Sequence, residues 1–382
     1  MAEIYLDNSA TTKVLPQVVE AMAEACSQCY GNPSSLHAKG IEAEKLVIQA
    51  RDALAGALGV KREEIYFTSG GTESNNWAIL GCVHRRRRRG NHIITTKIEH
   101  PSVLKVFQFL ESNGYEVSYL DSNKEGLVDL AQLKAMVRED TVLVSVMHVN
   151  NETGAIQPIE EIGQYLKEVN PRIAFHVDAV QSFGKIALHP VKSGIDLMSL
   201  SSHKIHGPKG VGALFIRKGL GMDPLLLGGE QENRMRAGTE NVPGIVGFGA
   251  AVTQVSGWLR TMNQIASLKG EFLERLQRQV PGVLVNGSLD KAVPNIINLS
   301  FPGIKGEVLV HYLEQSHIYV STGSACHSRS GKGSHVLAAL GVDDARLEGA
   351  IRVSFSHFNT SEEIGWTADK LAEAVLDLQR LR

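Results

Sequence analysis

Short apolar segments alternate with amphipathic segments through the first two thirds of the chain, and this alternation constrains the fold more than any other feature. The predicted strands are Glu64–Thr68, His92–Thr96, Glu116–Leu120, Val142–Met147, Ile173–Val177, Asp196–Leu200 and Val211–Ile216. Predicted helices follow several of them, at Pro101–Glu111, Leu130–Val137 and Ile159–Lys167. This order predicts an α/β fold with a large, mostly parallel sheet covered by helices on both faces. Ligands of such sheets bind beyond the carboxyl ends of the strands, so functional residues are expected there.

The pattern changes after Pro243, where one long helix is predicted to run toward Val280. Beyond it the predicted strands are Asn295–Phe301, Ile318–Ser321 and Ile351–Ser356, and the predicted helices are Gly306–Gln315, Gly333–Leu340 and Ser361–Leu381. A chain of 382 residues suits two domains. We therefore expect a large domain over residues 16–257 and a smaller α+β domain formed by residues 1–15 and 258–382.

A glycine-containing loop follows the first strand of the predicted sheet. The segment from Thr68 to Asn76 places Gly70 and Gly71 at the start of a helix, beside Thr72. Free N–H groups and the positive end of the helix dipole suit a phosphate there. A plain helix cap, with Ser69 or Thr72 as the capping side chain, is the alternative.

Two further strand ends carry charged residues. Asp178 ends a buried strand, where an unpaired carboxylate is costly, although an N-cap role is equally compatible with the motif. Lys204 lies between two apolar strands in an enclosed loop, where a lysine can form imines; Lys209 competes but is expected to face solvent. A phosphate site, an aspartate and a lysine are together what pyridoxal phosphate requires.

His100 and Cys326 complete the set of candidate residues. His100 follows a strand and opens a helix, so it could stack on a cofactor ring and carry protons; a lone histidine is more often structural. Cys326 lies in a loop rich in Gly and Ser, near His327 and Arg329, which favour its thiolate. An exposed cysteine without function is the alternative for this loop.

At this point the sequence resembles the cysteine desulfurases, which are pyridoxal-phosphate enzymes of the class-V aminotransferase type. The matching stretches span nearly the whole chain in family order: 5–12, 31–35, 68–75, 99–100, 147–154, 176–181, 201–210, 236–239 and 322–326. The resemblance implies the pyridoxal-phosphate-dependent transferase fold of type I, assembled as a homodimer. The stretch around Cys326 is similar to the branch with a long Ser-Gly-Ser-Ala-Cys loop. Gly333 stands where many members have proline.

The resemblance also implies a role for each matching residue. The implied catalytic residues are Lys204, Cys326 and His100. Those implied to bind the cofactor are Gly71, Thr72, Asp178, Gln181, Ser201, His203, Lys204 and, from the partner subunit, Thr239. Among these, Asp178 is implied to pair with the pyridine nitrogen of the cofactor and Gln181 to hydrogen-bond its ring oxygen. Asn151 and Arg352 are implied to hold the substrate carboxylate, although a structural ion pair would also explain an arginine within a strand. No resident metal is expected, although Cys326 could transiently ligate an iron–sulfur cluster.

The implied reaction converts L-cysteine to L-alanine and leaves a persulfide on Cys326. A sulfur-acceptor protein, either a cluster scaffold or a tRNA-thiolation enzyme, is the implied partner. An aminotransferase, a selenocysteine lyase and a non-catalytic scaffold of the same fold are the rival functions. An aminotransferase has no need of Cys326, and an inactive scaffold has no need of Lys204.

Composition narrows the remaining possibilities. The formal net charge of -2 favours neither a membrane nor direct nucleic-acid binding, and the absence of an apolar leader predicts a cytoplasmic protein. Cys26 and Cys29 form a C-x-x-C pair without a second pair, so we expect ordinary thiols. The run Arg85–Arg89 is expected to be a solvated helix end, with a docking patch for an acidic carrier or an RNA as the alternative.

Overall fold

A seven-stranded sheet forms the centre of the computed structural model, which describes residues 3–323 and 333–380. Its order is β2-β8-β7-β6-β5-β3-β4. The strands are β2 Ile65–Thr68, β3 His92–Thr96, β4 Glu116–Leu120, β5 Thr141–Met147, β6 Ala174–Asp178, β7 Leu197–Ser201 and β8 Gly212–Ile216. Strand β8 runs antiparallel to both of its neighbours, β2 and β7, whereas the other strand pairs are parallel. The ten residues between β7 and β8 are too few for the helical crossover that a parallel strand needs.

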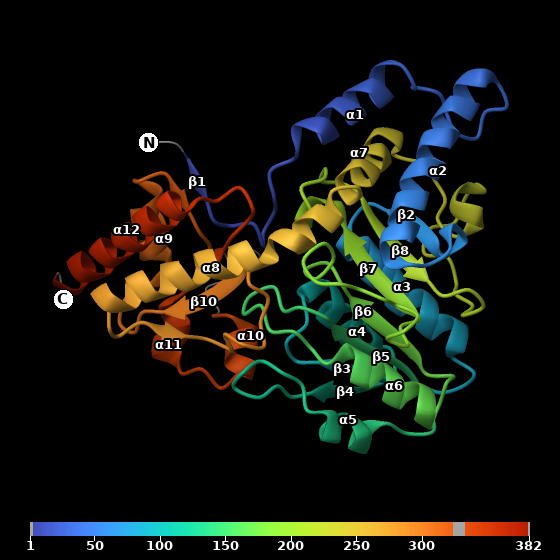
Figure 1. Cartoon of the computed structure of the whole chain (residues 1–382). Coiled ribbons are helices and arrows are strands. Elements are labelled where there is room, and N and C mark those ends of the chain that lie inside the picture. The colour runs from blue at the N-terminus through green and yellow to red at the C-terminus, as the bar shows by residue number, and fades with distance from the viewer. Residues whose placement is uncertain (1–2, 324–332, 381–382) are drawn as a thin grey trace.

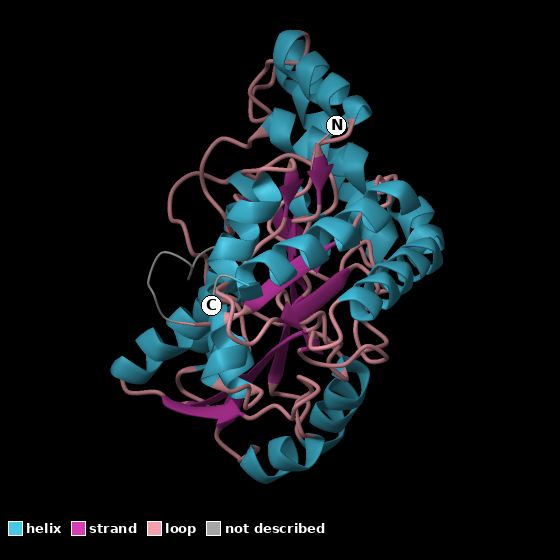
Figure 2. Cartoon of the chain, turned by 90° about the vertical axis from the view of Figure 1, so that its left-hand side faces the viewer, coloured by secondary structure: helices cyan, strands magenta, loops and turns pink. Residues whose placement is uncertain are grey.

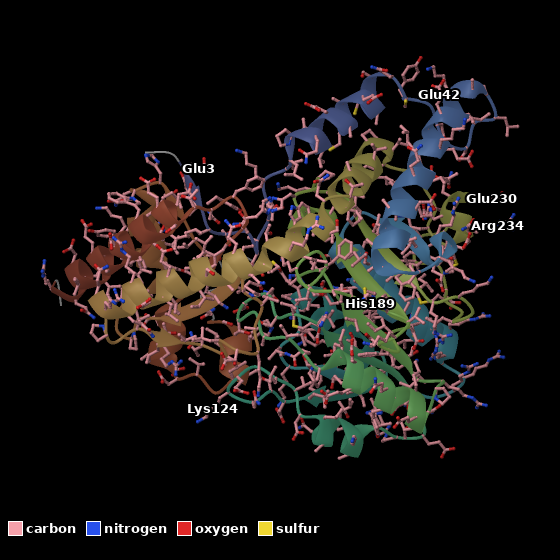
Figure 3. The ribbon with its side chains drawn as sticks, in the orientation of Figure 1. Glu3, Glu42, Lys124, His189, Glu230 and Arg234 are labelled. Atoms are coloured by element: carbon pink, nitrogen blue, oxygen red, sulfur yellow. The ribbon has the colours of Figure 1, made fainter. Side chains whose placement is uncertain are left out.

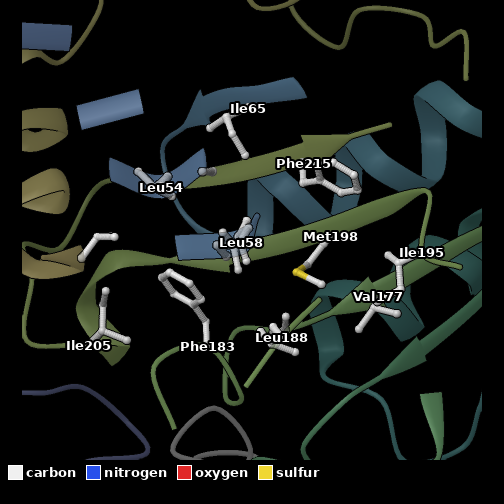
Figure 4. Packing of buried hydrophobic residues seen from close by; sticks show 14 of the residues in the cluster. Leu54, Leu58, Ile65, Val177, Phe183, Leu188, Ile195, Met198, Ile205 and Phe215 are labelled. Atoms are coloured by element: carbon white, nitrogen blue, oxygen red, sulfur yellow. The ribbon is translucent and has the colours of Figure 1, made fainter. Parts of the chain in front are cut away.

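Helices cover both faces of this sheet (Figures 1 and 2). They are α1 Pro16–Ser27, α2 Ala38–Leu58, α3 Gly71–Arg86, α4 Pro101–Ser112, α5 Leu130–Met136, α6 Ile159–Val169 and α7 Val242–Val252. Successive residues of a strand point to opposite faces. Leu143 therefore joins the core formed with α3 and α4, whereas Val144 joins the core formed with α2, α6 and α7. Figure 4 shows part of this second core, with Leu54 and Leu58 of α2 beside Met198 and Phe215 of the sheet.

The C-terminal part of the chain packs around a separate core. Its elements are α8 Val255–Gln279, β9 Leu284–Val285, β10 Ile296–Ser300, α9 Gly306–Glu314, β11 Ile318–Tyr319, α10 His335–Ala339, α11 Asp344–Glu348, β12 Ala350–Ser354 and α12 Ser361–Arg380. Strand β1, Ile4–Tyr5, pairs with β11, and Ile4 and Leu6 join this core. Figure 1 shows α8 extending from the large sheet region to α12. The domain boundaries given above stay a prediction.

The single long helix predicted after Pro243 is wrong. The chain forms α7 and α8 instead, with a bend of 55° between them. Phe248 of α7 packs in the core beneath the large sheet, whereas Phe272 of α8 packs in the C-terminal core. The helix breaks because its apolar face must change from one core to the other. Within the described residues no single helix is long and apolar enough to cross a bilayer, and α7 with α8 qualifies only as a bent pair, by length and composition.

Two features noted in the sequence lie on or near the surface. Cys26 is exposed, Cys29 is half-buried, and both are free thiols. The run Arg85–Arg89 is not uniformly solvated, because Arg86 is 3% exposed and donates to the carbonyls of Leu220 and Gly221. Arg86 is thus a structural residue that ties the end of α3 to the loop after β8.

Candidate active site

A cavity of about 300 Å³ opens beyond the carboxyl ends of the parallel strands. Its volume is at the lower end of the range for small-molecule sites, about 300–1,000 Å³. Ten of the predicted site residues line it: Gly71, Thr72, His100, Asn151, Asp178, Gln181, Ser201, His203, Lys204 and Arg352. Thr239 is exposed and is not among the lining residues, and Cys326 lies outside the described residues. The fold therefore brings together predicted site residues that are up to 281 positions apart in the sequence, from Gly71 to Arg352.

The first turn of α3 forms one wall of the cavity. Gly70 is the N-cap residue, and among the described residues no side chain caps the helix, so the alternative of a plain cap by Ser69 or Thr72 is not what the structure shows. A side chain at Gly71 would bring its Cβ to 2.8 Å from Val180 Cγ2. Glycine at 71 thus allows the backbone to lie against the loop after β6. An uncapped helix N-terminus that faces a cavity suits an anionic group such as a phosphate.

Asp178 lies at the end of β6 and is 5% exposed. Its Oδ2 accepts a hydrogen bond from Asn75 Nδ2 at 2.7 Å, and its Oδ1 accepts one from the backbone N–H of Val180 at 3.0 Å. These two donors hold the carboxylate at the cavity wall without neutralising it by an ion pair. The carboxylate is therefore oriented to receive a cationic or N–H group from a ligand.

Lys204 ends the short helix η2, Ser202–Lys204, which follows β7 directly. Its Nζ donates to the carbonyls of Ser9 at 2.6 Å and Ala10 at 2.7 Å. The preceding residue, His203, has its pKa lowered to about 3 by burial and by the nearby Lys204, Lys209 and Lys185, so its ring is neutral at pH 7. Its Nδ1 lies 3.1 Å from Thr11 Oγ1. The N-terminal segment therefore helps to position both side chains. The competitor Lys209 is exposed and is not among the cavity residues.

His100 is the N-cap of α4, as its place after β3 predicted. Its Nδ1 accepts from the backbone N–H of Ser102 at 3.2 Å and lies 2.8 Å from Ser102 Oγ. Because Nδ1 accepts a hydrogen bond, the proton of the neutral ring lies on Nε2. The cap thus fixes the tautomer and the orientation of a ring that lines the cavity.

Arg352, which is 2% exposed, comes from β12 and reaches the cavity from the C-terminal core. Its Nη2 pairs with Asp7 Oδ1 and its Nη1 donates to the carbonyl of Asn151, each at 2.8 Å. The structural ion pair considered above is therefore present. Within the described residues Arg352 Nε has no acceptor, and Asn151 Oδ1 has no donor. Two of the five N–H donors of Arg352 thus hold the side chain in place, and the Nε donor is among those left for a ligand.

The donor set fits pyridoxal phosphate. The uncapped start of α3 matches the phosphate, Asp178 matches the ring nitrogen, and Lys204 provides an amine for the aldehyde. Glu99, beside His100, is fully buried, and burial raises the pKa of its carboxyl to about 8, so it adds no negative charge near pH 7. The groups at the cavity that suit an anionic part of a ligand are therefore the uncapped start of α3 and the Lys204 amine.

The sequence did not single out several residues that shape the cavity: Ser9, Ala10, Asn75 and Ser102. Asn75 lies one turn after Gly71 and Thr72, so the helical period alone places it on their face of α3. Ser102 belongs to the first turn of α4 and contacts both His100 and Asn75. Ser9 and Ala10 act through backbone carbonyls, which residue type does not reveal.

Comparisons with known proteins show which family the chain resembles. The family model described as "Aminotransferase class-V" matches residues 4–366. A "Cysteine desulfurase IscS" from Methanosarcina thermophila is 46% identical over 99% of this chain and 93% of its own length. A solved structure described as "NIFS-LIKE PROTEIN" is 40% identical, with a TM-score of 0.93 and coverage of 99% of this chain and 100% of that one. Another, "SspA in complex with cysteine", is 36% identical, with a TM-score of 0.82 and coverage of 94% and 100%.

Proposed function

The chain belongs to the aminotransferase class-V family, and from this we propose that it is a pyridoxal-phosphate-dependent cysteine desulfurase. In this proposal, L-cysteine is converted to L-alanine and its sulfur is transferred to Cys326. The observation that carries it is the meeting of Lys204, Asp178, His100 and Arg352 around one cavity. The full-length similarity to proteins named cysteine desulfurase selects this reaction over transamination.

Each cavity residue has a distinct task in the proposed reaction. Asn151 and Arg352 hold the substrate carboxylate, and Arg352 is already oriented by Asp7. The Lys204 amine binds the cofactor and removes the proton from the substrate α-carbon. When bound, pyridoxal phosphate withdraws electrons from that carbon. His100, fixed by its cap on α4, carries protons at Nε2.

Sulfur transfer is assigned to Cys326, which lies outside the described residues. Its thiolate attacks the substrate sulfur, a new S–S bond forms, and the Cβ–S bond breaks with its electron pair remaining on carbon. A proton then completes the methyl group of alanine. A protein acceptor removes the persulfide sulfur; a cluster scaffold and a tRNA-thiolation enzyme are the proposed acceptors, in the cytoplasm.

We further propose a homodimer in which Thr239 binds the cofactor phosphate of the partner subunit. Thr239 is exposed on the segment between η3, Gln231–Arg234, and α7. Large apolar side chains are exposed nearby in the sequence, with Leu227 at 86%, and in the loop between α1 and α2, with Leu36 at 96%. Glu42, Glu230 and Arg234 point outward on the same side of the molecule (Figure 3). A contiguous patch of exposed apolar side chains is typical of an interaction surface, and in the proposed dimer Leu36 and Leu227 belong to such a patch.

The decisive experiment mixes the protein with pyridoxal phosphate and L-cysteine under a reductant and measures sulfide and alanine. We expect equal amounts of the two products. Cys326→Ala should keep the visible absorbance of the bound cofactor and lose alanine release, whereas Lys204→Ala should lose the lysine-linked absorbance. A keto acid in place of alanine would identify an aminotransferase, and alanine release by Cys326→Ala would remove Cys326 from the mechanism.

A further inference from the structure

A second lysine lies behind the cavity, and the reaction proposed above does not use it. Lys185 follows β6 in a turn, four residues after Gln181. Its Nζ donates to Gln181 Oε1 at 2.9 Å. Within the described residues it has no carboxylate partner, although an ammonium group carries three donors. A lysine amine in such a place is costly to bury, so packing alone does not explain it.

The surroundings of Lys185 disfavour a positive charge. A small cavity of about 40 Å³, large enough for water, is lined by both Lys185 and Lys204. The titratable groups that face Lys185 or interact with its charge are all basic: Lys204 and His203 of η2, Arg352 of β12, His206 and His357. Burial first, and then Lys204 and Arg352, lower the pKa of Lys185 to about 7.

The partner of Lys185 faces the active site with its other end. Gln181 Nε2 donates to the carbonyl of Ser9 at 2.9 Å, and Lys204 Nζ donates to the same carbonyl. Each end of the Gln181 amide therefore has a complementary partner: the carbonyl of Ser9 accepts and the amine of Lys185 donates. A ligand oxygen that replaces Ser9 as acceptor would meet the amide N–H only while Oε1 stays turned toward Lys185.

We propose that Lys185 is a positioning residue that fixes the orientation of the Gln181 amide, so that its N–H faces the ring oxygen of the cofactor. The inference rests on the proposed function and deepens it. A residue outside the cavity of about 300 Å³ would determine which end of the Gln181 amide meets the ring oxygen. Without Lys185 the amide can turn over and present its carbonyl oxygen, which repels an anionic ring oxygen.

The test is a double-mutant cycle read from the cofactor spectrum. The visible band of the protein loaded with pyridoxal phosphate is titrated with pH for the wild type, Lys185→Met, Gln181→Met and the double variant. An N–H donor to the ring oxygen lowers the titration midpoint, so Lys185→Met should raise it, by on the order of one pH unit. Because Lys185 acts through Gln181, the double variant should show the shift of Gln181→Met alone.

Lys209→Met is the matched control, because it removes an exposed lysine near His203 without touching Gln181, and its midpoint should equal that of the wild type. Shifts that add in the double variant, or an unshifted Lys185→Met, would overturn the inference. Lys185→Leu takes the place of Lys185→Met in the cycle if the latter does not fold. A wild type that stays colourless or releases no alanine would count against the proposed function instead.

Discussion

Asn75 shows how one uncharged side chain can determine what a buried carboxylate does. It donates to Asp178 at 2.7 Å and to Ser102 Oγ at 2.8 Å, and so links the starts of α3 and α4 to the end of β6. We predict that Asn75→Ala weakens the affinity for pyridoxal phosphate by roughly tenfold, because a lost hydrogen bond to a charged group costs about 1.5 kcal/mol. A fluorescence titration of the cofactor-free protein measures this. Asn113→Ala, on the surface at the end of α4, is the control, and an unchanged affinity in Asn75→Ala would contradict the prediction.

Glu99 provides a test of charge at the same scale. Its Oε1 accepts from the Met147 N–H at 2.7 Å and from Thr96, while Oε2 has no partner among the described residues. Burial, which outweighs these donors, raises the pKa of its carboxyl from 4.5 to about 8. The unfolded chain therefore releases this proton at a lower pH than the folded chain, and the stability contribution of Glu99 falls as the pH rises from 4.5 to 8.

Glu99→Gln removes this titration and keeps an acceptor for Met147. We predict that the free energy of unfolding of the variant rises relative to that of the wild type as the pH goes from 5 to 8. The change in this difference should be about 3–4 kcal/mol if the Glu99 pKa has its full shift. Urea unfolding of the two cofactor-free proteins at both pH values gives the difference. A difference that stays constant with pH would mean that the Glu99 carboxyl titrates normally.

At the scale of elements, close backbone contacts decide which helix positions tolerate a side chain. A Cβ at Gly163 of α6 would lie 1.9 Å from the carbonyl oxygen of Ser193. At Gly56 of α2, no heavy atom of residues 3–323 or 333–380 lies within 4 Å of such a Cβ. The two glycines occupy helices on the same face of the sheet but differ in what they contact.

Gly163→Ala should therefore destabilise the protein by about 2 kcal/mol or more, since the loop at Ser193 must move away. Gly56→Ala should instead stabilise it by about 0.5–1 kcal/mol through helix propensity alone. Thermal unfolding of both variants measures the contrast. Equal shifts of the same sign would show that α6 does not pack against the Ser193 loop as described.

At the scale of the whole molecule, the site joins two cores, because Arg352 comes from the C-terminal one and Lys204 from the sheet. The proposed dimer would add a third contributor through Thr239. We predict that Leu36→Asp combined with Leu227→Asp shifts the protein from dimer to monomer, since two charges would enter an apolar interface. Light scattering coupled to size exclusion gives the mass. The controls are Val169→Asp and Val191→Asp, because these valines are also exposed, at 49% and 66%. A dimer that persists in the Leu36/Leu227 variant would place the interface elsewhere.

Local patterns in the sequence determined the strands and most helices. Strand β3 and strand β4 match their predicted ranges, and Lys204, Asp178 and His100 lie around the cavity where strand ends predicted them. These features are local, because side-chain periodicity and the order of strand and loop are set by residues that lie close together in the sequence. The prediction of the cavity from strand ends also needed only the rule that parallel strands share one carboxyl edge.

Tertiary structure alone decided the rest. The break between α7 and α8, the burial of Arg86 and the enclosure of Lys185 depend on neighbours far away in the sequence. The residue type of an arginine or a lysine does not reveal whether its side chain is solvated or enclosed, because that environment is set by segments that meet only on folding. Residue type and spacing therefore predicted which groups surround the cavity, whereas long-range packing determined how those groups are held.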